Sequence, residues 1–323
     1  MCIPSIFNTE IRQISHFKPC SDLVRFASIY KEECNMKISE ILNNNRVTVS
    51  FEVFPPKEWV KIENTKAVVR EMAKSAPAFM SVTYGAAGTT SGFTTEIANE
   101  IKNRGVTPLS HLTCLTSTKD KINSVINELK ENGIENILAL RGDIPKDFVF
   151  PDEQHFHYAY ELVNTVKSVG DFCVGGACYP EVHPESANKV EDIQHLKEKV
   201  DCGLDFLTTQ MFFDNDVFYN FRENCAIKGI NVPIIAGIMP ITNAGQIKRS
   251  VELSGCRFPK KFEKIIERFG DNPAAMKQAG IIYATEQIID LMANGQNNIH
   301  IYTMNKPDVA GSIMKGLSEI ING

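Results

Sequence analysis

The stretch Ser50-Phe51-Glu52-Val53-Phe54-Pro55-Pro56-Lys57 reads as a short buried strand that carries one carboxylate and stops at two prolines. Val and Phe favour a pleated, buried surface, and consecutive prolines cannot continue a hydrogen-bonded ladder. Burying an unpaired charge is costly unless the carboxyl holds its proton. Because a protonated carboxyl can serve as a general acid near neutral pH, Glu52 is a candidate acid. The alternative is a strand-end glutamate paired with a nearby lysine.

The strand around Glu52 is the first of eight apolar runs rich in β-forming residues. Helical stretches separate the runs; in Lys121–Leu129, for example, apolar residues recur at spacings of three and four, which indicates one buried helix face. Regular alternation of this kind predicts a (β/α)8 TIM barrel in the α/β class, as a single domain rather than an open sheet. The eight runs are Val47–Phe54, Phe79–Tyr84, Thr107–Cys114, Ile137–Leu140, Phe172–Cys178, Phe206–Met211, Val232–Ile238 and Ile299–Thr303.

The boundaries of the expected helices follow from their end signals. Gly133, Gly203 and Gly229 stand where a left-handed helix cap is needed. The long segment 258–294 is predicted to hold one helix besides Ala275–Ala293, and residues 37–42 a short helix before the first strand. Residues 1–35 show no clear strand. We interpret them as an N-terminal extension of uncertain role, with Met36 as a candidate initiator and residues 36–323 as the barrel.

Composition excludes several classes of function. A net charge of −5 and a pI near 5.9 give no basic footprint, which argues against a nucleic-acid partner. No apolar run approaches the roughly 18 residues that span a bilayer, so we expect no membrane segment. The first residues lack a charged-then-apolar signal pattern, and we therefore expect a cytoplasmic protein.

Metal and dinucleotide motifs are also missing. The nine cysteines are scattered without a C-x-x-C pair, which predicts reduced thiols, and His155-x-His157 has no matching ligands nearby in the sequence, so no metal site is expected. Gly85, Gly88 and Gly92 have the wrong spacing for a Rossmann site. Any nucleotide cofactor would therefore lie on the barrel itself.

In a TIM barrel the active site lies at the C-terminal ends of the strands, so polar residues that end the runs are the candidates. Arg141, followed by a glycine that allows close backbone approach, is suited to hold a diphosphate. The alternative for Arg141 is an ion pair with Asp143 or with a glutamate at the rim.

Six of these strand-end motifs, in order and at compatible spacing, closely resemble the bacterial methylenetetrahydrofolate reductases. The resemblance covers about residues 47–305. The motifs are Ser50-Phe51-Glu52-Val53-Phe54-Pro55-Pro56-Lys57, Ser81-Val82-Thr83-Tyr84-Gly85, His111-Leu112-Thr113-Cys114, Ala139-Leu140-Arg141-Gly142-Asp143, Tyr179-Pro180-Glu181-Val182-His183-Pro184 and Thr209-Gln210-Met211-Phe212-Phe213-Asp214.

The resemblance implies an FAD-containing barrel that reduces 5,10-methylenetetrahydrofolate to 5-methyltetrahydrofolate, in one-carbon metabolism and methionine biosynthesis. It implies a ping-pong reaction in which NADH or NADPH reduces the flavin and leaves before the folate binds. Glu52 would protonate N10 of the folate, and Asp143 would stabilise the 5-iminium cation and hold the pterin. Gln210, which both donates and accepts, suits the pterin and the nicotinamide carboxamide. A homo-oligomer is expected, of a size that the sequence leaves open.

The remaining site residues also come from the resemblance. Lys306 would meet the glutamate tail of the folate, and Thr83 matches a residue near the nicotinamide. The residues that would hold the cofactors are Thr83, Tyr84, Ala86, His111, Arg141, Gly142, Tyr158, Ala159, Tyr179, His183, Ser186, Asp192, His195 and Lys199.

Three positions depart from the bacterial pattern. Ala244 stands where a stacking Phe is common, Lys306 where an Arg is common, and Glu198 where a basic residue is common near the adenine of FAD. These departures leave the nicotinamide preference and the tightness of FAD binding open. An alternative function is a flavoprotein subunit that receives electrons from a partner protein. A relative such as a proline dehydrogenase is disfavoured by the Tyr179–Pro184 and Arg141–Asp143 motifs.

Overall fold

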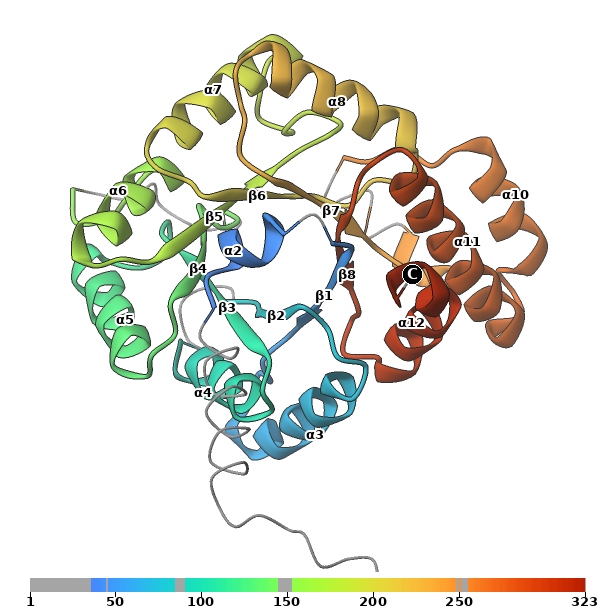
Figure 1. The fold of residues 1–323 in the computed structure, drawn as a ribbon, viewed down its shortest axis with the longest axis horizontal. Helices are drawn as coiled ribbons and strands as arrows, with labels where there is room; N and C mark the ends of the chain where they lie inside the picture. Colours follow the sequence, from blue (N-terminus) through green and yellow to red (C-terminus); the bar gives the residue numbers. More distant parts are fainter. Residues whose placement is uncertain are drawn as a thin grey trace, which may run out of the picture.

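Eight parallel strands close into a barrel in chain order in the computed structural model, which describes residues 36–44, 46–84, 91–144, 153–247, 250 and 255–322 (Figure 1). The predicted single-domain (β/α)8 barrel is confirmed. Residues 1–35 and Ala86 lie outside the described residues. The strands are β1 (Thr48–Val53), β2 (Phe79–Val82), β3 (Thr107–Thr113), β4 (Asn136–Leu140), β5 (Cys173–Cys178), β6 (Phe206–Thr209), β7 (Ile234–Ile238) and β8 (Asn298–Tyr302).

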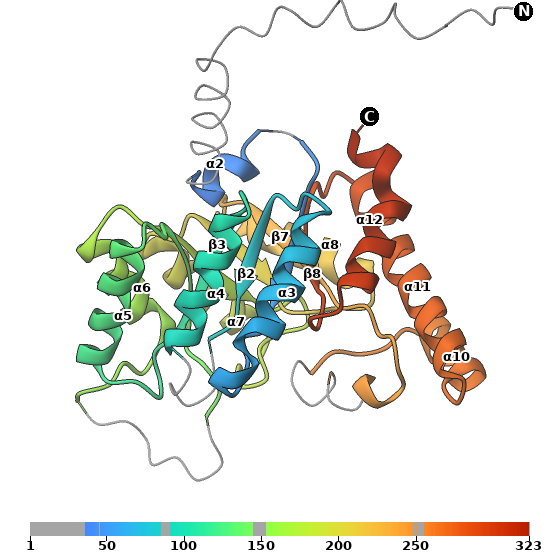
Figure 2. The ribbon, with the colours of Figure 1, turned by 90° about the horizontal axis from the view of Figure 1, so that it is seen from below.

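One short helix lies across the N-terminal end of the barrel, and the longer helices form a ring outside the strands (Figures 1 and 2). The additional helix expected in segment 258–294 is α10, and Gly133, Gly203 and Gly229 take the positive φ angles expected of helix caps. The helices are α2 (Ile38–Leu42), η1 (Trp59–Lys61), α3 (Ile62–Ala73), α4 (Ser91–Asn103), α5 (Lys119–Glu131), α6 (Ala159–Val169), α7 (Lys189–Asp201), α8 (Asn215–Ile227), α10 (Lys260–Phe269), α11 (Pro273–Ala293) and α12 (Pro307–Asn322).

Several element boundaries differ from the prediction by one or two residues. Strand β2 ends at Val82, so Thr83 and Tyr84 stand just beyond it at the rim. Helix α8 begins at Asn215, because the Asp214 carboxylate accepts a hydrogen bond from the Asp216 N–H at 3.0 Å.

Two hydrophobic clusters fix the barrel. Outward-facing residues of the strands, such as Phe51 and Val53, are fully buried against the helices. Inside the barrel, Phe79 and Phe206 meet Ile38 of α2, which therefore closes the N-terminal end. Asn136 holds this helix in place, because its carbonyl oxygen accepts from the Ile38 N–H at 2.8 Å. At the opposite, C-terminal end, a third cluster that includes Met211, Phe213 and Ile241 lies beside the polar strand ends.

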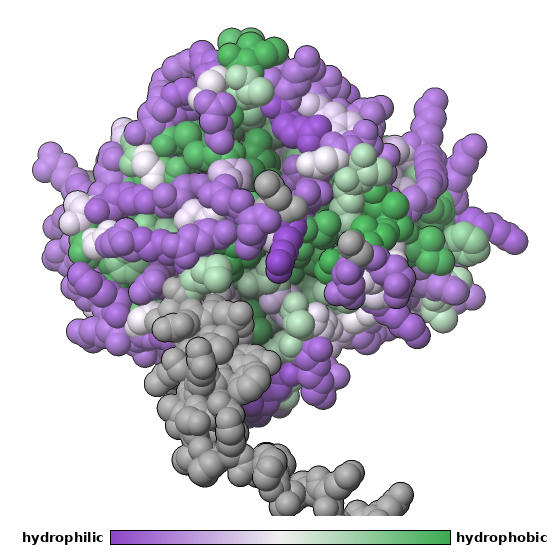
Figure 3. All heavy atoms as spheres, viewed as in Figure 1, coloured by the Kyte–Doolittle hydropathy of each residue, from purple (hydrophilic) through white to green (hydrophobic). Residues whose placement is uncertain are grey.

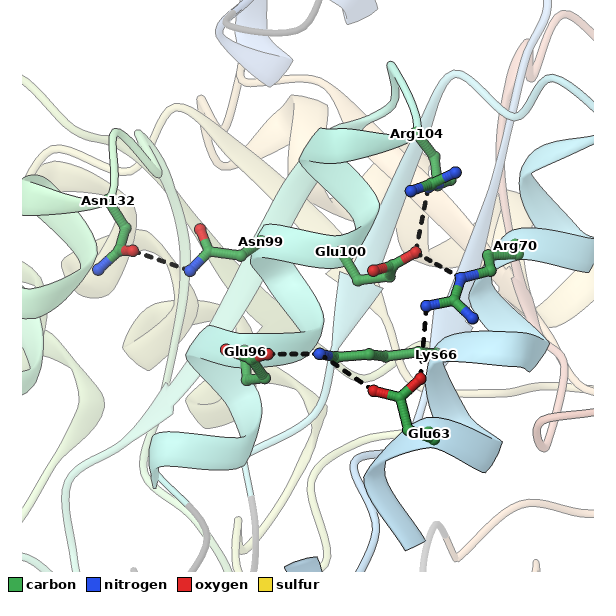
Figure 4. Close-up of polar contacts among 8 residues, drawn as sticks. All are labelled: Glu63, Lys66, Arg70, Glu96, Asn99, Glu100, Arg104 and Asn132. Carbon is green, nitrogen blue, oxygen red and sulfur yellow. Dashed lines mark hydrogen bonds and ion pairs between the residues drawn. The ribbon is translucent and has the colours of Figure 1, made fainter.

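A charged network joins α3 to α4 on the outside of the barrel (Figure 4). The buried Glu100 carboxylate accepts from Arg70 at 2.9 Å and pairs with Arg104 at 3.1 Å, and Lys66 pairs with Glu96 at 2.5 Å. Lys66, Glu96 and Glu100 line a polar hollow that lies away from the strand ends. We therefore assign the network to helix packing and not to the candidate site.

The outer surface is mostly hydrophilic, and hydrophobic residues gather over α11 and α12 in the view of Figure 3. Ile282 and Ile289 of α11 and Ile320 of α12 are exposed. None of the helices in the described part of the chain is long and apolar enough to cross a membrane.

Candidate active site

Glu52 lies on β1 inside the barrel near its C-terminal end, opposite Ser81 of β2 and Tyr302 of β8 in the strand register. Its side chain is buried, and burial raises the pKa of its carboxyl to about 8. A carboxyl with this pKa is mostly protonated at neutral pH, because the low-dielectric surroundings disfavour the charged form. The environment expected for Glu52 from the sequence is observed; its role as the acid stays a prediction.

His111 of β3 stands beside Glu52, with its Nε2 at 3.7 Å from the Glu52 carboxylate. Burial lowers the pKa of His111 to about 3. Both groups are therefore neutral near pH 7, and their contact is not an ion pair. Among the described residues, His111 Nε2 has no hydrogen-bond partner. A buried ring nitrogen without a partner is costly, so it is suited to receive a ligand atom.

Arg141, just after β4, forms a two-pronged ion pair with Glu185, with both N–O distances at 2.6 Å. This is the rim-glutamate alternative that the sequence left open, and Asp143 is exposed instead of paired with Arg141 in the described structure. The hydrogen bonds with Glu185 raise the pKa of Arg141, and those with Arg141 lower the pKa of Glu185. The guanidinium is thus positioned for an anion that has the geometry of a carboxylate or a phosphate.

Six of the fourteen cofactor-binding candidates form one cluster between β4, β5 and α7: Arg141, Tyr179, His183, Ser186, Asp192 and Lys199. The rings of Tyr179 and His183 meet edge to face at 4.6 Å. Burial lowers the pKa of His183, and the charges of Glu185, Arg141, Asp192 and Lys199 all reach it. The structure therefore brings together residues that lie far apart in the sequence.

Hydrogen bonds hold the α7 side of this cluster. Ser186 donates to the Asp192 carboxylate at 2.9 Å, and the Lys199 ammonium donates to the Ala177 carbonyl at 2.5 Å. Burial lowers the pKa of Lys199. His195 is exposed on the same helix, so it lies at the margin of the cluster.

The other candidates lie just after β2, just after β4 and at the start of α6. Tyr84 is buried just after β2, beside Thr83, and Gly142 takes a φ of +87°, which favours glycine. Tyr158 is exposed at the start of α6, and Ala159 is the first residue of that helix.

The two substrate-binding candidates after β6 and β8 are each held by the protein. The Gln210 N–H donates to the Cys178 carbonyl at 2.7 Å, and the Gln210 side-chain oxygen accepts from the Met211 N–H at 2.9 Å. Its side-chain nitrogen has no hydrogen bond within the described residues. Lys306 donates to the Thr242 hydroxyl at 2.7 Å and forms no ion pair with any described carboxylate, which leaves its charge for an anionic ligand.

Sequence reasoning gave no role to the buried polar residues beneath Glu52. Ser50 donates to the Ile299 carbonyl at 3.0 Å, so its oxygen accepts from His300 Nδ1 at 2.7 Å, and His300 Nε2 accepts from Ser81 at 3.1 Å. Burial lowers the pKa of His300 to about 3. The sequence could have indicated this buried polar group. Ser50 is two residues from Glu52 and His300 is two residues from Tyr302, and this spacing places each pair on one face of a strand. No group of three or more potential metal ligands is found among the described residues.

Known proteins match the chain over most of its length. The family model for methylenetetrahydrofolate reductase matches residues 37–318. The 5,10-methylenetetrahydrofolate reductase of Buchnera aphidicola is 36% identical over 290 residues, which cover 89% of this chain and 97% of that protein. The Escherichia coli enzyme of the same name is 33% identical, with 89% and 96% covered.

A plant protein and a solved structure extend the comparison. Methylenetetrahydrofolate reductase (NADH) 1 of Arabidopsis thaliana is 36% identical over 88% of this chain and half of its own length. A Clostridium thermocellum protein described as binding two copies of 5-methyl-5,6,7,8-tetrahydrofolic acid has a TM-score of 0.60 at 13% identity, and covers 89% of this chain and 99% of its own. At that identity the structural likeness shows the fold alone. By its matched residues and its relatives, the chain belongs to the methylenetetrahydrofolate reductase family.

Proposed function

We propose that this chain reduces 5,10-methylenetetrahydrofolate to 5-methyltetrahydrofolate, with bound FAD and with NADH or NADPH as the reductant. Membership of the family supports an oxidoreductase of folate one-carbon metabolism. The observation that carries the finer proposal is Glu52, a buried carboxyl with a pKa of about 8 inside the barrel end where TIM barrels place their chemistry.

The residues present fit a flavin nucleotide. The His111 Nε2, which has no partner among the described residues, offers one hydrogen-bonding position. The two guanidinium N–H groups that Arg141 now donates to Glu185 would match a diphosphate if Glu185 moved aside. In the same cluster, Lys199 adds a second cation and Tyr179 adds an aromatic ring. Bound there, FAD would supply hydride transfer, taking a hydride from the reduced nicotinamide and passing it to the folate.

Residues of this chain would supply the proton to the folate and stabilise the positive charge that forms on it. When the bond between N10 and the methylene carbon breaks, Glu52 gives its proton to N10, and the carbon stays on N5 as an iminium cation that a hydride converts to a methyl group. The exposed Asp143 carboxylate would stabilise that cation and pair with the amino-pyrimidine edge of the pterin. Its charge already reaches Tyr179, whose pKa is raised to about 12, first by burial and then by Asp143.

Two further residues would orient the substrate. Gln210 has its oxygen engaged by the Met211 N–H, so its side-chain nitrogen is the group left to donate to a pterin or a carboxamide. Lys306, held by Thr242, would attract the glutamate tail of the folate as a single point charge, without the two-pronged geometry of an arginine.

An absorbance spectrum of the purified protein tests this proposal. We expect flavin bands that bleach when NADH or NADPH is added without oxygen and return when methylenetetrahydrofolate follows. A folded, colourless protein that gains no colour with added FAD would overturn the proposal. Bands that bleach only in the presence of another protein would favour the electron-accepting subunit.

A further inference from the structure

The backbone pairing between β6 and β7 is replaced by side-chain contacts at the C-terminal end of the barrel. The two strands pair at Leu207 with Ile234 and at Thr208 with Ile235. At the next residue, Thr209, the side-chain hydroxyl accepts from the Gly237 N–H at 2.9 Å. The Thr209 carbonyl instead accepts a hydrogen bond from the phenol of Tyr302 at 2.5 Å. The last carbonyl of β6 is thus held by a residue of β8.

Tyr302 reaches past β7 because Gly237 has no side chain. A Cβ at position 237 would lie 2.6 Å from the Tyr302 hydroxyl and 2.4 Å from the Thr209 carbonyl oxygen. Both distances are far below van der Waals contact. The bridge between Tyr302 and Thr209 therefore requires glycine at this position of β7.

The Tyr302 ring is itself held from below. It meets the His300 ring edge to face at 5.4 Å, and His300 stacks on Phe79 at 5.7 Å. Ser50 and Ser81 fix both nitrogens of His300. Burial raises the pKa of Tyr302 well above its usual range, so the phenol remains a neutral donor. Contacts within the protein are therefore enough to position the Tyr302 and His300 rings.

The two ends of the bridge are next to two proposed functional residues. Tyr302 stands opposite Glu52 in the pairing of β1 with β8. Its acceptor, Thr209, directly precedes Gln210, whose own N–H is bonded to the Cys178 carbonyl. We propose that Tyr302 is a positioning residue, whose hydroxyl holds the Thr209–Gln210 segment and so sets the place of Gln210 relative to Glu52. This inference rests on the proposed function, in which Gln210 binds the folate.

Tyr302→Phe removes the hydroxyl and keeps the ring. The matched control is Tyr283→Phe, because the Tyr283 hydroxyl also donates to a backbone carbonyl, that of Phe213, at 2.8 Å. Calorimetric titration of the FAD-loaded protein with 5-methyltetrahydrofolate gives the affinity directly. We expect Tyr302→Phe to weaken binding by about 3- to 10-fold, the range for one lost hydrogen bond, and Tyr283→Phe by less than about twofold.

A double-mutant cycle separates positioning from general loosening of the barrel. In a Gln210→Ala background, Tyr302→Phe should weaken folate binding by less than about twofold further, because the residue it positions is gone. Gly237→Ala, which intrudes on the same bridge, should weaken binding in the native background at least as much as Tyr302→Phe.

The other possible results distinguish failure of the positioning role from failure of the proposed function. Equal effects of Tyr302→Phe and Tyr283→Phe, or an undiminished effect of Tyr302→Phe in the Gln210→Ala background, would overturn the positioning role and leave the proposed function intact. If the native FAD-loaded protein binds no 5-methyltetrahydrofolate, the proposed function is overturned and this inference with it.

Discussion

Replacing Glu52 by Gln should stabilise the folded protein at neutral pH. The side chain keeps its shape, but the native protein no longer has to hold a carboxyl in its protonated form. Burial raises the pKa of Glu52 from an ordinary value of 4.5 to about 8 in the fold. Between these two values the native state binds a proton that the unfolded chain has released, so the stability contributed at this position falls as pH rises.

The size of the effect follows from the distance between pH and the unfolded pKa. Each pH unit is worth 1.36 kcal/mol, so at pH 7 the wild type has lost about 3 kcal/mol at this position relative to pH 4.5. A neutral Gln escapes this loss. The difference in unfolding free energy between Glu52→Gln and wild type should therefore grow by roughly 1 kcal/mol per unit from pH 5 to 7 and level off near pH 8.

Chemical denaturation of both proteins at several pH values measures this difference. Glu223→Gln, on an exposed face of α8, is the control and should stay within about 0.5 kcal/mol of wild type throughout. A difference that is independent of pH, or one that grows as pH falls, would show that Glu52 is ionised in the fold and would refute the reasoning.

Three further predictions concern the cofactor, acid stability and the N-terminal extension. Arg141→Ala should weaken FAD binding by about 10- to 100-fold, the loss of a charged hydrogen-bonding group, as measured by flavin fluorescence; an unchanged affinity would assign Arg141 to its ion pair with Glu185 alone. Burial lowers the pKa of His111 and of His300 to about 3, so as pH drops below 6.5 the unfolded chain takes up protons before the folded one and stability should fall. In a His300→Asn variant the denaturation midpoint should fall less steeply with pH. An equally steep fall would contradict a buried, neutral His300. A chain truncated to begin at Met36 should fold and keep its flavin, since Ile38 and Asn136 already close the barrel; loss of solubility or of flavin would show that residues 1–35 belong to the barrel.

The sequence predicts the barrel well because its signals are local. Alternation of apolar runs with helices at regular spacing requires no knowledge of which side chains meet, and the position of Glu52 in a buried strand already implies a raised pKa. Strand ends were less well predicted, as at Thr83 and Tyr84, because apolar residues continue past the point where the hydrogen-bonded ladder stops.

The contacts between strand ends could not be predicted in this way. Arg141 and Glu185 are 44 residues apart, and Tyr302 and Thr209 are 93 residues apart, yet each pair is joined by hydrogen bonds. Such pairings depend on the register and tilt of the closed barrel and on the space that a residue such as Gly237 leaves open. The sequence could offer the rim glutamate only as an alternative, and it gave Tyr302 no role.

The separate half-reactions of Glu52→Gln test the central claim most directly. Stopped-flow absorbance at the flavin band follows reduction by nicotinamide and then reoxidation by methylenetetrahydrofolate in one sample. Reduction needs no acid, so its rate should change little, whereas reoxidation needs the proton for N10 and should slow by about 10²- to 10⁴-fold. Equal slowing of both steps, or an unchanged folate step, would contradict the assignment of Glu52 as the acid.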